Sequence, residues 1–203
     1  GTDMVGTRTR ARNALAVAVI GVGVFATIGE ASSTSKGSNP APNAGQTSGS
    51  SPAGGPSSSK AAPIPVGTAV EVAKGWKVQV NSAVLNADAQ LAQANQFNKP
   101  QPGEQFVLVN VTISNGGTTP DAAFTNVKLS LLPPSGVAVS GLSSCMVSAP
   151  DAIDQTAQMQ PGASQTGNVC FSPKATDVVN SLLLAEPTFT LDGAKDQQFF
   201  ALQ

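Results

Sequence analysis

Residues 106–115, FVLVNVTISN, alternate apolar and polar side chains with a period of two, which is the pattern of a β-strand with one buried face. The pattern ends at Asn115-Gly116-Gly117, a run that favours a turn. The face expected to be buried carries Val107, Val109, Val111 and Ile113, and the opposite face carries Phe106, Leu108, Asn110 and Thr112. This strand requires neighbouring strands, so the chain must build a sheet around it.

Similar short runs recur along residues 66–203 and are separated by turn residues such as Gly75 and Pro133-Pro134-Ser135-Gly136. The only helix that the sequence predicts is residues 88–96, with Asp88 as a candidate N-cap. Seven or eight short strands without a βαβ rhythm predict an all-β fold, an antiparallel β-sandwich. The further strand candidates are 70–72, 76–80, 127–131, 137–140, 164–171, 181–184 and 198–202.

A different pattern occupies the N-terminal end. Arg8, Arg10 and Arg12 precede an uncharged, mostly apolar run over residues 14–29, an arrangement that keeps the N-terminus in the cytoplasm. As a helix the run would be about 24 Å long, against a hydrocarbon core of about 30 Å. Two interpretations remain open. The run is either a retained signal anchor, which makes a single-pass membrane protein, or a signal peptide cleaved after Ala31, which makes a secreted one.

Residues 32–65 consist largely of serine, glycine and proline, and Ile64 is their only large apolar residue. Such a composition buries too little apolar surface to offset the entropy of ordering, so it predicts a disordered tether. The expected organisation is therefore a cytoplasmic tail (1–13), a transmembrane or signal helix (14–29), a tether (30–65) and one folded domain (66–203).

The chain has two cysteines, Cys145 and Cys170. An even pair beyond an export signal predicts a disulfide, whereas a redox-active pair would favour a C-x-x-C spacing. Closing a loop of about 25 residues stabilises the folded state by roughly 3.5 kcal/mol in the loop-entropy model.

Composition argues against several classes of function. The chain has no histidine, which removes Ser-His-Asp catalysis and imidazole metal ligands. The 11 basic residues against 12 acidic ones leave no basic surface typical of nucleic-acid binding. Asp121, Asp151 and Asp154 lack the spacing of a calcium loop, so we treat them as solvated loop residues. We therefore expect no catalytic residues, no cofactor, no metal and no nucleic-acid partner.

Four segments of the folded part resemble an exported bacterial immunoglobulin-like family of unknown function, found in Gram-positive and actinobacterial lipoproteins and anchored surface proteins. The segments are 67–70, 76–80, 102–115 and 160–171, the last with a Pro-Gly start and a Cys170-Phe171 end. The resemblance implies an immunoglobulin-like sandwich, similar in fold to the mycobacterial immunoprotective secreted antigen. It brings no catalytic residues. The lipid-attachment cysteine of many members is absent, so attachment would depend on residues 14–29.

These observations predict a non-enzymatic cell-envelope protein that presents its domain outside the membrane for contact with a protein. The most specific form of this prediction is an accessory subunit of a membrane complex. Phe106 and Leu108, on the second face of the central strand, are candidate interaction residues. Trp76 is a further candidate, although its place at the start of a strand favours the core. The alternative is a module that binds a small molecule, a lipid or a cell-wall glycan through an apolar pocket.

Overall fold

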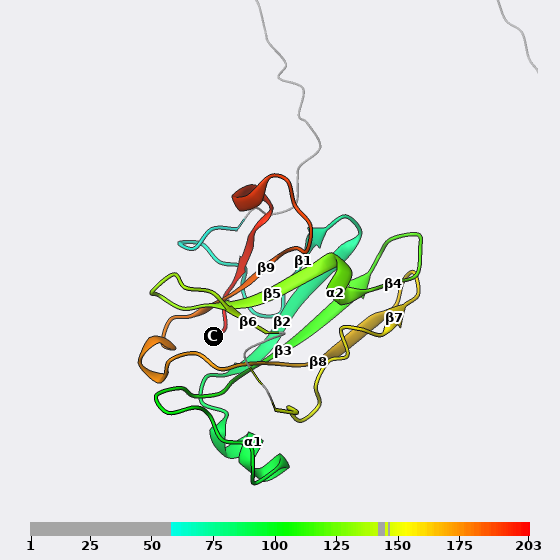
Figure 1. The fold of residues 1–203 in the computed structure, drawn as a ribbon. Helices are drawn as coiled ribbons and strands as arrows, with labels where there is room; N and C mark the ends of the chain where they lie inside the picture. Colours follow the sequence, from blue (N-terminus) through cyan, green and yellow to red (C-terminus); the bar gives the residue numbers. More distant parts are fainter. Residues whose placement is uncertain (1–57, 142–144, 146) are drawn as a thin grey trace, which may run out of the picture. The chain divides into compact units, whose positions relative to one another are not determined.

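The structure is a computed structural model that describes residues 58–141, 145 and 147–203. The expected cytoplasmic tail, the helix over 14–29 and most of the tether lie outside these residues. Within the described part, two four-stranded antiparallel sheets and a two-stranded ribbon make up most of the regular structure (Figure 1). No helix of the described part is long and apolar enough to cross a membrane.

The first sheet contains the strand that the alternation predicts. Its order is β1 (Ala69–Ala73), β2 (Trp76–Val84), β3 (Val107–Asn115) and β8 (Ser164–Phe171). Strand β3 lies in the interior of this sheet, so β2 and β8 both pair with it in antiparallel register. The tight β1–β2 turn depends on Gly75, whose φ of +79° is a conformation that side chains with a Cβ disfavour.

The second sheet is built from later segments. Its order is β10 (Gln198–Phe200), β9 (Leu182–Pro187), β5 (Val127–Leu132) and β6 (Val139–Ser140). The small ribbon joins β4 (Asp121–Ala122) to β7 (Gln158–Met159), two strands that sequence reasoning missed because each is only two residues long. The other strands lie where the alternation predicts them, within a few residues at each end.

The two four-stranded sheets stack as a β-sandwich. Strand β3 pairs with β8 in the first sheet, and β10, β9 and β5 lie side by side in the second. The chain crosses between the sheets from β3 to β5 and again from β8 to β9. The disulfide, however, joins the β6–β7 connection to β8 and does not link the two sheets.

The main core lies between the two sheets. Valines of β2 and β3 meet leucines of β5 and β9, and Trp76 and Phe200 are buried among them. The β3 face expected to be buried has no solvent exposure at any of its four positions. This core is a sufficient reason for the sheets to stack, since burying each large apolar side chain contributes about 1.5–3 kcal/mol. Its largest fully buried members include Val78, Val80, Val109, Val111, Ile113, Leu131 and Leu183.

In the described part of the chain, four short helices connect the strands: α1 (Asp88–Ala94), α2 (Ala123–Asn126), η1 (Ala175–Asp177) and η2 (Gly193–Asp196). The first matches the predicted helix, but its cap differs. The N-cap position is Ala87, and the Asp88 carboxylate instead accepts the backbone N–H of Phe106 at 2.7 Å. Asp88 therefore fixes α1 to the start of β3, a long-range contact that a local capping rule does not include.

The folded structure begins earlier than the strand pattern indicates. Ile64, which the composition places in the tether, is only 4% exposed and belongs to the main core. Its backbone N–H donates to Phe199 O at 2.7 Å and its carbonyl accepts from Ala201 N–H at 2.8 Å. Ser58 adds a hydrogen bond from Phe199 N–H to its Oγ at 2.7 Å. Residues 58–64 therefore line the outer edge of β10.

We expect Ile64→Ala to lower the free energy of unfolding by about 2–5 kcal/mol, because it leaves a cavity beside β10. Val66→Ala is the matched control: Val66 is 37% exposed, and its truncation should change stability by no more than about 0.5 kcal/mol. Chemical denaturation followed by fluorescence of Trp76, the single tryptophan, measures both. Equal effects of the two substitutions would contradict the placement of Ile64 in the core.

Candidate functional site

The three candidate interaction residues are interior residues. Phe106, Leu108 and Trp76 are each 3% exposed, so they do not form a surface. Trp76 belongs to the main core, as its position at the start of β2 favours. The prediction for Phe106 and Leu108 was wrong for a different reason: a second, smaller core covers the outer face of β3 at this end.

The second core combines α1 with the disulfide. Leu91 of α1 packs with Ala87, Phe106, Leu108 and Cys170, and Cys145 contacts the same cluster. The predicted disulfide between Cys145 and Cys170 is confirmed, with an S–S distance of 2.05 Å and Cα atoms 5.7 Å apart. The cross-link therefore also holds the β6–β7 connection against the sheet.

The outer edge of β8 is occupied by this same connection. Asn168 N–H donates to Asp151 O at 2.8 Å, and Ile153 N–H donates to Asn168 O at 3.1 Å. The approach is close because residue 167 is glycine: a Cβ there would lie 2.7 Å from Ile153 N. Residues 151–153 thus add a short strand-like partner that pairs with the outer edge of β8 at Asn168.

The exposed outer face of β2, β3 and β8 carries uncharged polar side chains that bond to one another. Rows of like residues face each other across β3 and β8: Asn110 with Asn168 at 2.9 Å, Thr112 with Thr166 at 2.7 Å, and Ser114 with Ser164 at 2.8 Å. Asn81 of β2 joins them by donating to Asn110 and Thr112. This face satisfies its own hydrogen bonds and carries no charge in these rows.

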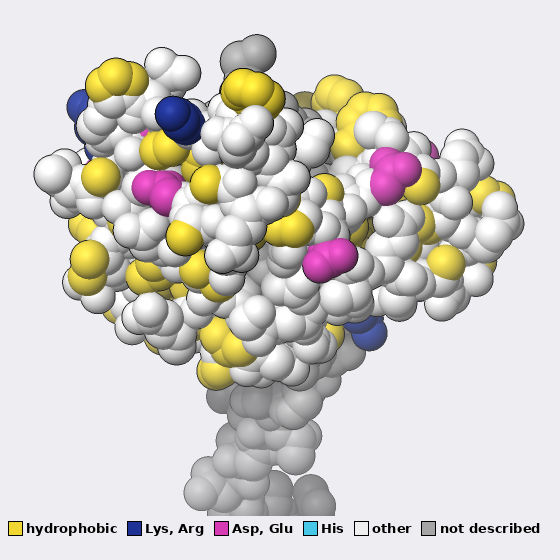
Figure 2. Space-filling model, turned by 90° about the horizontal axis from the view of Figure 1, so that it is seen from below, with side chains coloured by type: hydrophobic (Ala, Val, Ile, Leu, Met, Phe, Trp, Pro, Cys, Tyr) yellow, Lys and Arg dark blue, Asp and Glu magenta, His cyan; other side chains and the backbone are white. Residues whose placement is uncertain are grey.

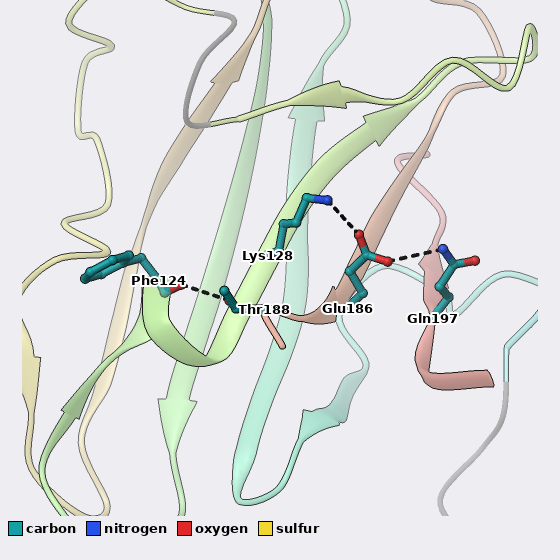
Figure 3. A network of polar contacts seen from close by, with 5 residues as sticks. All are labelled: Phe124, Lys128, Glu186, Thr188 and Gln197. Atoms are coloured by element: carbon teal, nitrogen blue, oxygen red, sulfur yellow. Dashed lines mark hydrogen bonds and ion pairs between the residues drawn. The ribbon is translucent and has the colours of Figure 1, made fainter. Parts of the chain in front are cut away.

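The outer face of the second sheet holds the single ion pair of the described residues. Lys128 Nζ lies 3.0 Å from Glu186 Oε1, and Gln197 donates to Glu186 Oε2 at 3.2 Å (Figure 3). Nearby, Thr188 Oγ1 donates to the backbone carbonyl of Phe124 in α2 at 2.9 Å (Figure 3). These contacts tie β5, β9 and the residue before β10 together on the solvent side and hold α2 to the segment that follows β9.

The remaining long edge of the first sheet, β1, borders an open cleft. Strand β1 pairs with β2 on one side only, and its other side faces a cleft of about 940 Å³. The opposite wall comes from α2, from Pro187 and Phe189 after β9, and from Lys195 in η2. In Figure 1 the connection from β9 to β10, drawn in red, passes close to β1. We name this feature the β1 cleft.

Lysines predominate among the charges of the β1 cleft. Lys74, Lys77 and Lys195 line it and are exposed, and none of them belongs to an ion pair within the described part of the chain. The two carboxylates in the wall have internal partners: Glu71 accepts the N–H of Gly75 at 3.4 Å, and Asp196 accepts the hydroxyl of Thr190. Three ammonium groups thus stand against two carboxylates in the wall, so the cleft has a small excess of positive charge.

Asp121 shapes the α2 wall of the cleft. Its carboxylate accepts from Asn126 Nδ2 at 3.0 Å, from Ala122 N–H at 2.8 Å and from Thr125 Oγ1 at 2.9 Å. These hydrogen bonds, that from Asn126 first, lower the pKa of Asp121 from its ordinary value because they favour the ionised form. Thr125 and Asn126 line the cleft, so Asp121 orients two of its wall residues.

The three aspartates that we considered as calcium ligands do not form a metal site in this structure. In the described residues, no group of three or more acidic, histidine or cysteine side chains is placed to hold a metal ion. The Asp121 carboxylate accepts a hydrogen bond from Thr125 in α2, and the backbone carbonyl of Asp151 accepts one from Asn168 N–H in β8. The Asp154 carboxylate accepts a hydrogen bond from the Thr156 hydroxyl at 2.6 Å. The Thr156 hydrogen bonds lower the pKa of Asp154, as expected for a carboxylate that closes its own turn.

Sequence reasoning did not find the β1 cleft. Lys74 and Lys77 flank the Gly75 turn, whereas Lys195 and Phe189 come from a connection more than 100 residues later. No local pattern joins these segments. The one available signal was Phe189-Thr190-Leu191, two large apolar residues in a connection, and both are exposed in the structure.

A family model matches most of the folded domain. The family model described as domain of unknown function DUF4352 covers residues 64–193. The chain belongs to this family. The match begins at Ile64, the residue at which the main core also begins. The expected membership of a family of unknown function is thus confirmed, and the similarity to the mycobacterial secreted antigen stays a prediction.

Two solved structures are similar to this DUF4352 protein. A conserved hypothetical protein from Bacillus anthracis has 14% identity and a TM-score of 0.41, covering 66% of this chain and 94% of that one. An uncharacterized β-sandwich protein from Clostridium difficile 630 has 10% identity and a TM-score of 0.40, covering 70% of this chain and 95% of that one. No curated protein with significant similarity was found.

We expect the Asp121→Asn variant to be less stable than the natural chain at neutral pH, and the difference to shrink in acid. A depressed pKa contributes stability that is fully present above the unfolded pKa of about 3.9 and is lost as pH falls through the folded pKa. Unfolding free energies from pH 7 to pH 2 measure this. A difference that stays constant over the whole range would contradict the role of the Asp121 carboxylate.

Proposed function

We propose that this chain is a non-enzymatic protein of the cell envelope, anchored by residues 14–29 with its N-terminus in the cytoplasm, whose β-sandwich contacts a partner protein outside the membrane. In the most specific form of this proposal, the chain is an accessory subunit of a membrane complex. The observation that carries the proposal is the order of segments: three arginines, an apolar run, a Ser/Gly/Pro-rich stretch and then a disulfide-containing domain.

The disulfide supports the external placement. Disulfides persist in oxidising compartments and are rare in the cytosol, and Cys145–Cys170 joins two segments that are distant in sequence. The fold likeness to the mycobacterial secreted antigen, which we expect from the sequence, belongs to this proposal and agrees with a domain that leaves the cytoplasm. If residues 14–29 were cleaved after Ala31, the same domain would be secreted.

A contact role fits the surface better than the alternative of a ligand-binding module. A small-molecule or lipid site is usually a deep pocket with mainly apolar walls. The β1 cleft is open instead, and lysines and the backbone of an edge strand make up much of its wall. These features are typical of surfaces that bind polypeptide, in which main-chain hydrogen bonds and charge complementarity provide the affinity.

The orientation can be tested with an epitope tag placed after Gln203. Protease added to intact cells should remove the tag from the natural chain. It should also remove it from the control in which Arg8, Arg10 and Arg12 are replaced by lysine, because that control keeps the positive charge. Replacement of the same three residues by glutamate should protect a large part of the tag. A tag that is protected in the natural chain would contradict the proposed topology.

The subunit role has a separate test. The full-length chain is purified from native membranes in mild detergent, and its mass is compared with that of the chain alone. We expect a larger assembly with a reproducible second protein. Recovery of the chain by itself at stoichiometric purity would count against an accessory subunit and leave the topology result unaffected.

A further inference from the structure

We infer that the β1 cleft binds an extended segment of the partner protein, that this segment adds a strand to the free edge of β1, and that its residues alternate between acidic and apolar. The inference rests on the proposed function, since it names the surface and the kind of partner for the same contact role. It depends on three observations: the free edge, the side chains opposite it and the charges around it.

Within the described residues, no position on the outer edge of strand β1 is paired. Residues 151–153 pair with the edge of β8 at Asn168, in the middle of that strand, and Ile64 pairs with the edge of β10. The remaining edge strand, β6, has only two residues. Strand β1 has five residues and pairs with β2 alone, so alternate N–H and C=O groups of β1 point toward the cleft. Such an edge is the surface to which extended peptides add.

The side chains around this edge define what an added strand must carry. Val70 and Val72 point into the core, and Ala69 and Glu71 lie exposed on the outer side. After the irregularity between Glu71 and Ala73, Ala73 pairs with Trp76 and packs against the core. An added strand would continue this alternation, because the pleat is shared across a sheet. Its inner side chains would meet the opposite wall, where Phe189 is 86% exposed beside Pro187. Covering Phe189 favours apolar residues at those positions.

The charges favour acidic residues at the other positions. Residues 58–203 contain seven lysines and ten acidic residues, so the domain as a whole is negatively charged. Three of those lysines nevertheless line this one cleft together with two carboxylates, so the cleft is positive where the domain as a whole is negative. On the face drawn in Figure 2, by contrast, the charged side chains are scattered among hydrophobic and uncharged ones.

A second copy of the chain is a less suitable occupant. Pairing two β1 edges would bring the excess positive charge of both clefts to one interface, and like charges disfavour that arrangement. An acidic segment has the opposite charge and needs no change in the domain. We therefore assign the cleft to an acidic, extended stretch of a different protein.

Three eight-residue peptides test the chemistry. In each, valine alternates with one other residue, which is glutamate, glutamine or lysine. We expect the glutamate peptide to bind the full-length chain in detergent at least about tenfold more tightly than the lysine peptide, and to weaken as salt is added. Amide shifts should concentrate in Ala69–Ala73. Equal binding of the three peptides, no binding of the glutamate peptide up to about 1 mM, or shifts centred on β8 would overturn the inference.

Matched charge reversals test the surface. The Lys74→Glu/Lys195→Glu variant should lose at least about tenfold in affinity for the glutamate peptide. The Lys99→Glu/Lys174→Glu control changes the net charge by the same amount at two exposed lysines that do not line the cleft, and its affinity should stay within about twofold. An equal loss in both variants would show that overall charge, and not the cleft, attracts the peptide.

A photo-crosslinker at Ala69 identifies the natural segment, with a crosslinker at Ser164 on β8 as the control. We expect adducts from Ala69 alone, to a stretch in which acidic and apolar residues alternate. An adduct to another copy of this chain, to a neutral or basic stretch, or from Ser164 alone would overturn the cleft assignment. A partner that co-purifies equally with the natural chain and the Lys74→Glu/Lys195→Glu variant would refute the cleft and leave the proposed function standing.

Discussion

The pairing of β3 with both β2 and β8 is the interaction on which the rest of the domain depends. It places the valine face of β3 against the leucines of β5 and β9, and so stacks the two sheets around one core. It also decides which strands become edges. With β3 inside and β8 at one end, β2 carries β1 outward to the other end, where no further strand of the described part covers it.

The features that the sequence could predict are those encoded locally. Alternation in the β3 segment identifies its buried face because side chains in a strand point to opposite sides, whatever the partner strands are. Gly75 marks the β1–β2 turn for a similarly local reason. The disulfide was predictable because only two cysteines are present, so the pairing has one solution. These signals suffice for a sandwich and for its strand order along the chain.

The features that the sequence could not predict depend on contacts between distant segments. Ile64 lies in a stretch with the composition of a tether, yet it is buried because β10, more than 130 residues later, offers an unpaired edge. Phe106 and Leu108 have the pattern of an exposed second face, but α1 and the disulfide-linked connection cover them. The β1 cleft has the same origin, because Lys74 and Lys195 are distant in sequence and line one cleft only in the folded domain.

Amide hydrogen exchange of the full-length chain tests most directly whether β1 is an open edge of the first sheet. In β1, amides that bond to β2 should exchange slowly, while the alternating amides that face the cleft should exchange at rates near those of exposed backbone. Amides along β3 should be protected at every position, because both of its sides are paired. Uniform protection along β1, equal to that of β3, would contradict the account.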